Sequence, residues 1–108
     1  MNILEKYRRV SKELFEETVK TIYDTSDTLA TSMENSMIPV DVKKKGNVES
    51  GLYVKKNEGL VYCEIENVDG IHIINECKKV DIELLKKRLK KYDILKVLDI
   101  SLKLMKKD

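Results

Sequence analysis

The amino-acid sequence predicts an α+β fold: a long N-terminal helix, a three- to four-stranded antiparallel meander sheet, and one or two C-terminal helices. Three observations lead to this prediction. Residues 3–37 place apolar side chains at helical spacing, residues 52–77 read as successive short strands, and residues 81–107 return to helical spacing. We expect a single domain over 1–108, with 1–37 helical, 38–77 forming the antiparallel sheet and 81–107 helical.

The N-terminal segment carries one continuous apolar stripe, made of Ile3, Leu4, Tyr7, Val10, Leu14, Phe15, Val19, Ile22, Leu29 and Met33. One helix over 3–37, ending before Pro39, would be about 50 Å long at 1.5 Å per residue. That exceeds the width of a compact domain of this size, so the helix should project and need a partner helix. A break near Asp24-Thr25-Ser26-Asp27, whose residue types favour caps and turns, is the alternative.

The central segment is predicted to form a meander of antiparallel strands. Turn residues separate the strands, and Pro39 suits an edge strand because an edge does not need its missing N–H group. The expected strands are Leu52–Lys56, Leu60–Glu66 and Ile71–Glu76, with Ile38–Val42 as a fourth strand; the expected loops are Lys43–Asn47, Asn57–Gly59 and Asn67–Gly70.

Both faces of this sheet are apolar. We assume that Val54 pairs with Tyr62 and Glu64 with Ile73. One face then holds Tyr53, Val61, Cys63, Ile65, His72 and Ile74, and the other holds Leu52, Val54, Leu60, Tyr62, Ile71 and Ile73. A slip of one residue would exchange the two sets without changing their apolar character. A small domain can cover one face with its own helices, so a partner should cover the other.

The two cysteines are predicted to be free thiols. If Asn67–Gly70 forms the turn, Cys63 faces Ile74, and Cys77 lies about 10 Å along the strand at roughly 3.4 Å per residue. A disulfide needs Cα atoms within about 7 Å. Two cysteines without CxxC spacing also make a weak case for metal or redox chemistry.

The C-terminal segment begins at Asp81, a suitable N-cap. Its first part turns Ile82, Leu85, Leu89 and Tyr92 to one side, and residues 94–105 carry a wide apolar arc centred on a different side. Either the helix breaks at Tyr92-Asp93, or one helix packs in opposite directions along its length, as in an intertwined dimer.

These features together predict an oligomer, most simply a homodimer. The wide apolar arc of residues 94–105 exceeds what a helix on a small monomer needs to bury. The same segment of a neighbouring chain could cover the second sheet face. The predicted interface consists of Leu52, Val54, Tyr62, Ile73, Ile94, Val97, Leu98, Leu102 and Met105.

Composition narrows the class of protein. The net charge is +2, and the charged fraction of 37% exceeds the typical roughly 25%. The abundance of Lys and Glu and the absence of Gln fit a thermophilic source, and an AT-rich genome, which would produce much of the same bias, is the alternative. No apolar run approaches the roughly 20 residues that span a bilayer, and the N-terminus lacks a signal-peptide core. We therefore expect a cytoplasmic protein without a membrane partner.

Enzymatic chemistry finds little support in the sequence. His72 is the sole histidine and lies between apolar strand residues, and the four glycines match no phosphate-binding loop. Glu64 and Glu66 share a sheet face, but alternating strand positions also place solvent-facing charges together. We predict no catalytic residues, no metal site and no cofactor, and lean against an enzyme.

The strongest candidate site is a basic row on the helix after Asp81, opposite its apolar side. The row contains Lys86, Lys87, Arg88, Lys90 and Lys91. It could neutralise nucleic-acid phosphates, although a lysine-rich helix face is usually only solvated. We therefore expect a non-enzymatic homo-oligomeric interaction protein. A nucleic-acid-binding protein using residues 86–91 is the alternative, and a small-ligand binder or enzyme with a site between subunits is the third.

Overall fold

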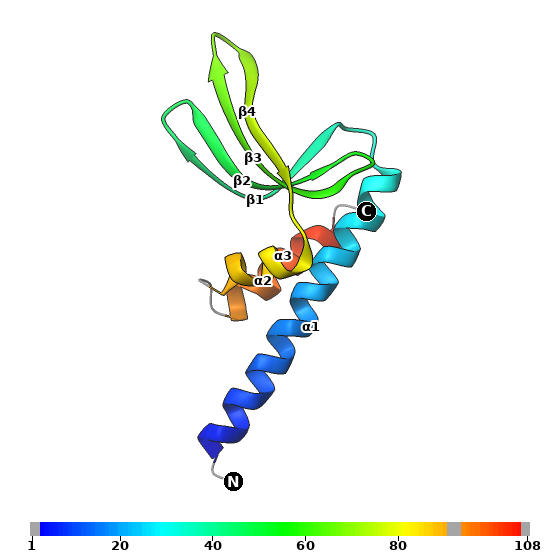
Figure 1. Ribbon diagram of the computed structural model, residues 1–108, viewed down its shortest axis with the longest axis vertical. Helices are drawn as coiled ribbons and strands as arrows, with labels where there is room; N and C mark the ends of the chain where they lie inside the picture. The colour runs from blue at the N-terminus through cyan, green and yellow to red at the C-terminus, as the bar shows by residue number, and fades with distance from the viewer. Residues whose placement is uncertain (1–2, 91–93, 107–108) are drawn as a thin grey trace.

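A computed structural model describes residues 3–90 and 94–106, apart from the side chains of residues 4–10. The chain forms the predicted α+β fold, with a long helix, a four-stranded antiparallel sheet and two C-terminal helices (Figure 1). In chain order these are α1 (Ile3–Ser32), β1 (Met37–Lys45), β2 (Val48–Lys55), β3 (Gly59–Val68), β4 (Ile71–Lys79), α2 (Ile82–Leu89) and α3 (Ile94–Met105). No helix in this described part is long and apolar enough to cross a membrane.

Helix α1 is continuous, so the alternative break at residues 24–27 does not occur. The helix ends at Ser32 and not at residue 37 as predicted. The loop between β2 and β3 lies against this end: the Asn57 N–H donates to the Ala30 carbonyl at 2.9 Å, and the Lys56 N–H donates to the Ser36 carbonyl at 2.9 Å. The first bond satisfies a carbonyl that the helix end would otherwise leave open, and the second lies in the connection that leads into β1.

The sheet has the simple order β1-β2-β3-β4, and each neighbouring pair is antiparallel. The predicted pairing was wrong by two residues between β2 and β3, where Val54 pairs with Leu60 and Leu52 with Tyr62. It was also wrong between β3 and β4, where Glu66 faces Ile73. Shifts of two residues keep on their predicted faces the residues, up to Ile74, that were assigned to the two faces. Beyond the irregularity in β4 the shift is three residues.

The cysteine prediction is corrected by the structure. The turn between β3 and β4 contains only Asp69 and Gly70, with φ values of 51° and 80°, and Val68 pairs with Ile71. These positive angles are those of a tight two-residue hairpin turn. Further along β4, an irregularity shifts the pairing with β3 by one more residue. Cys77 therefore lies directly opposite Cys63. Their Cα atoms are 4.1 Å apart, and the two residues form a disulfide.

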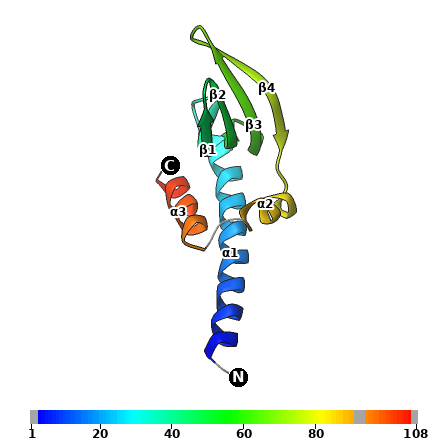
Figure 2. The same ribbon diagram turned by 90° about the vertical axis from the view of Figure 1, so that its left-hand side faces the viewer.

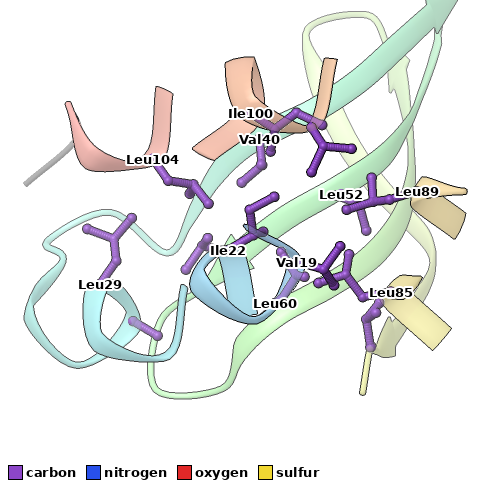
Figure 3. Close-up of a cluster of buried hydrophobic side chains, with 14 of the residues drawn as sticks. Val19, Ile22, Leu29, Val40, Leu52, Leu60, Leu85, Leu89, Ile100 and Leu104 are labelled. Atoms are coloured by element: carbon purple, nitrogen blue, oxygen red, sulfur yellow. The ribbon is translucent and has the colours of Figure 1, made fainter. Parts of the chain in front are cut away.

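The main core lies between one sheet face and all three helices (Figure 3). Helices α2 and α3 lie on opposite sides of α1 (Figure 2), and the two apolar sides that the sequence placed in different directions enter the same core. Two separate helices thus bury both sides within one chain. The core includes Val19, Ile22, Leu52, Val54, Leu60, Leu85, Leu89, Val97, Ile100 and Leu104. The predicted break at Tyr92-Asp93 falls outside the described residues.

The opposite sheet face has a small cluster of its own, centred on Tyr53, Val61 and Cys63. Among the described residues, only strand residues contribute to it. Tyr53 is 3% exposed and Cys63 is fully buried even so, because Met37, Val42 and Ile65 pack around them. The second face is therefore partly closed by the strands themselves, which the sequence-based argument for a covering partner did not anticipate.

Candidate functional site

The predicted basic row is divided by the structure. Lys86, Lys87 and Lys90 line a groove between α2 and α1, whereas Arg88 points to the sheet and stacks its guanidinium 4.0 Å from the centre of the Tyr62 ring. This is the geometry of a cation–π contact. Arg88 stands three residues after the buried Leu85, a spacing that keeps it near the apolar side of the helix. Lys91 lies outside the described residues.

Helix α1 completes the groove with Lys12, Phe15 and Glu16, and Glu83 of α2 closes the remaining wall. The hollow has a volume of about 460 Å³, within the range of small-molecule sites. Asp81 fixes the start of α2 as predicted, because its carboxylate accepts the Leu84 N–H at 2.8 Å. This cap and the buried Leu85 and Leu89 set the rotation of α2 that turns the lysines toward α1.

The charge in the groove is positive. Four lysines face two glutamates, and one glutamate is engaged, since Glu83 lies 3.6 Å from the Lys86 ammonium. Among the side chains that the structure describes, Lys12, Lys87 and Lys90 have no ion-pair partner. All three are exposed, and the half-buried Phe15 lines the same groove. An anion would gain from this arrangement, because exposed lysines with no partner lose little when they bind it.

The predicted interface residues are spread over three environments. Leu52, Val54 and Val97 lie inside the core, and Tyr62, Ile94 and Leu98 are half-buried. Ile73, Leu102 and Met105 are exposed. On α3, Leu102 and Met105 continue an outer stripe with Leu95 and Leu98 at alternating three- and four-residue spacing. Leu95 is 72% exposed, so this stripe is open to solvent.

The first half of α1 stands away from the rest of the molecule, as both views show (Figures 1 and 2). The first buried residues of the described part are Thr18 and Val19, although the helix begins at Ile3. Phe15 is half-buried against the main core, so the part of α1 that precedes it, about 12 residues or roughly 18 Å of helix at 1.5 Å per residue, projects beyond the domain. Ile3 and Leu14 are both exposed on this half. The length of the molecule, 58 Å against 31 Å and 22 Å, reflects the projection.

A second groove lies on the sheet face away from the helices, with a volume of about 430 Å³. Its walls are formed by Met37, Pro39, Ile65 and Ile74 with Ser36, Glu49, Tyr53 and His72. The Tyr53 hydroxyl donates to the Glu49 carboxylate at 3.2 Å. Burial, followed by the charge of Glu49 and this hydrogen bond, raises the pKa of Tyr53 to about 12.

The raised pKa of Tyr53 predicts a loss of stability at alkaline pH. Unfolded tyrosine ionises near pH 10, whereas folded Tyr53 holds its proton until about pH 12. The folded state therefore binds more protons in this window, and stability should fall as pH rises from about 10 to 12. Urea unfolding of the wild type should show this fall more steeply than Tyr53→Phe. Equal slopes in the two proteins would show that Tyr53 ionises as easily in the folded state as in the unfolded state.

Sequence reasoning missed Lys12, Phe15 and the Tyr53–Glu49 pair. Lys12 and Phe15 lie far from α2 in the chain, and only the packing of α2 on α1 brings them to the lysines. The pattern Glu49-Ser50-Gly51-Leu52-Tyr53 did carry a signal, because alternate strand residues share a face and Glu49 and Tyr53 are therefore expected on the same side of the strand. In the described part of the chain, no group of three His, Cys, Asp or Glu residues could hold a metal ion.

Comparison with known proteins adds no family to this description, because the chain matches no protein-family model, no curated protein and no solved structure at a significant level.

Proposed function

We propose that this protein is a non-enzymatic interaction module that forms a homodimer through the projecting half of α1. The observation that supports the proposal is that, among the described side chains, Phe15 is the first on α1 that packs against a core cluster, although the helix begins at Ile3. A helical segment of about 12 residues is marginal in water without tertiary contacts. A second copy of the same helix would supply those contacts.

The spacing of apolar residues on this half suits a helix pair. Ile3, Tyr7, Val10 and Leu14 follow each other at four, three and four residues. This is the alternation that brings apolar positions to one seam of a two-helix coiled coil. The groove residues Lys12 and Phe15 lie outside the seam in this spacing, so pairing of α1 leaves the groove open.

Charge favours the antiparallel orientation of the pair. If Ile3 packs near Leu14 of the second copy, and Tyr7 near its Val10, the flanking positions bring Lys6 beside Glu13 of the other chain. Two-fold symmetry repeats the contact, so each pair of helices gains two oppositely charged contacts. In a parallel pair the corresponding flanking partners are uncharged, Ser11 for Lys6 and Thr18 for Glu13.

Sedimentation equilibrium at micromolar concentration tests the proposal. The wild type should be a dimer, and Leu14→Glu should be a monomer because it places a charge in the apolar seam. Thr21→Glu, an exposed position beyond the projecting half, is the matched control and should remain a dimer. A monomeric wild type would refute self-association. Dissociation by Leu102→Glu but not by Leu14→Glu would move the interface to the outer stripe of α3.

A charge exchange tests the orientation. Lys6→Glu and Glu13→Lys should each weaken the dimer, because each places like charges side by side across the interface. The double variant restores opposite charges and should recover most of the lost affinity, a coupling that a double-mutant cycle measures. Additive weakening in the double variant would exclude the antiparallel register.

A further inference from the structure

The groove between α1 and α2 is a second feature that self-association of α1 does not explain. It combines three exposed lysines without ion-pair partners in the described chain, a half-buried aromatic ring and an open hollow of about 460 Å³. We propose that this groove binds single-stranded nucleic acid, with the lysines on the phosphates and a base stacked on Phe15.

The chemistry of the lining favours a phosphate backbone. Lys12 reaches the groove from α1, whereas Lys87 and Lys90 reach it from α2, so positive charge lies on both sides of the hollow. Lysine is a compact point charge that neutralises phosphate without reading a base edge, and the only described arginine near the row, Arg88, is stacked on Tyr62. Binding should therefore depend on the backbone and not on base sequence.

Phe15 distinguishes this groove from a general basic surface. An aromatic ring in a positively charged groove is the combination by which proteins hold single strands, since every base has a face that can stack. The hollow has the volume of a small-ligand site, which suits an unstacked nucleotide and not the width of a duplex. Glu16 and Glu83 also line the groove, so the net lysine excess is two and the affinity should be modest and sensitive to salt.

Fluorescence anisotropy with labelled twelve-residue oligo-dT and oligo-U measures the binding. Single strands lose affinity with salt at a slope of about −0.7 for each phosphate neutralised, so three free lysines predict a slope of roughly −2. Lys87→Ala/Lys90→Ala should reduce the slope to roughly −0.7 and weaken binding at low salt by about tenfold. Phe15→Leu keeps the apolar volume and should cost about tenfold through lost stacking.

The matched control is Lys43→Ala/Lys44→Ala, which removes the same charge from the exposed end of β1. It should bind as the wild type does, and circular dichroism should show all variants folded. Binding of either oligonucleotide supports the proposal, and a preference identifies DNA or RNA as the natural source. Equal loss in the groove and control variants, tighter binding of a duplex, or equally effective competition by polyglutamate would each overturn it.

Discussion

Gly51→Ala should destabilise the protein by about 3 kcal/mol or more, because the new methyl group would collide with the backbone of β1. A Cβ atom at Gly51 would approach the Asp41 carbonyl oxygen closely and would lie 2.7 Å from the Val42 Cα atom. Neither is the movable end of a side chain, so β1 would have to separate from β2 where Val42 pairs with Gly51. Gly51 also has a φ of 148°, which alanine rarely adopts.

Gly46→Ala provides the matched control for this prediction. Gly46 also has a positive φ, at 62°, but a Cβ atom there would meet nothing within 4 Å. Its substitution should cost only about 1 kcal/mol from the backbone conformation. Urea unfolding of the two variants thus separates the collision from the conformational cost. Equal losses in both would show that β1 and β2 do not approach as closely at Gly51 as the structure describes.

The elements of the fold were predictable because their signals are local. Helical spacing identified α1 and the helical character of the C-terminal segment, without deciding between one helix and two, and Asp81 marked the start of α2. Alternation identified both sheet faces, and these survived a wrong register since the error was two residues. The exact pairing was not predictable, because the sequence permitted a four-residue turn at Asn67–Gly70 as well as the two-residue turn that forms. The added residue in β4 leaves no mark on the apolar pattern.

The candidate site was predictable only in part for a related reason. Lys86, Lys87 and Lys90 share one helix, so their grouping follows from spacing alone. Lys12 and Phe15 join them in one groove only because α2 packs across α1. The angle between two packed helices is set by side chains of the core, and it cannot be predicted from one short segment of sequence. The sequence predicted that residues 94–105 carry more apolar surface than one chain buries. In the structure the inner side of α3 is buried and its outer stripe is exposed. What covers that stripe stays a prediction.

The disulfide between Cys63 and Cys77 connects the edge strand β4 to the interior of the sheet. The β4 strand is exposed at every residue except Cys77, so its side chains hold it to the sheet weakly. The two cysteines have a sequence separation of 14. A cross-link that closes a loop of this length lowers the conformational entropy of the unfolded chain and so stabilises the folded state by about 3 kcal/mol. The bond is also unusual for the cytoplasmic location that we predict, where thiols are kept reduced.

Reduction should therefore lower the free energy of unfolding of the wild type by about 3 kcal/mol, and β4 should be the first strand to open. Urea unfolding with and without a phosphine reductant measures the loss, and hydrogen exchange locates it. Cys63→Ala/Cys77→Ala should be less stable from the start and indifferent to the reductant. Alkylation of the untreated, unfolded wild type should find no free thiol. Two alkylated cysteines per chain in that sample would mean that Cys63 and Cys77 are reduced in solution. Only backbone hydrogen bonds and packing against the buried Cys63 side chain would then hold β4 to the sheet.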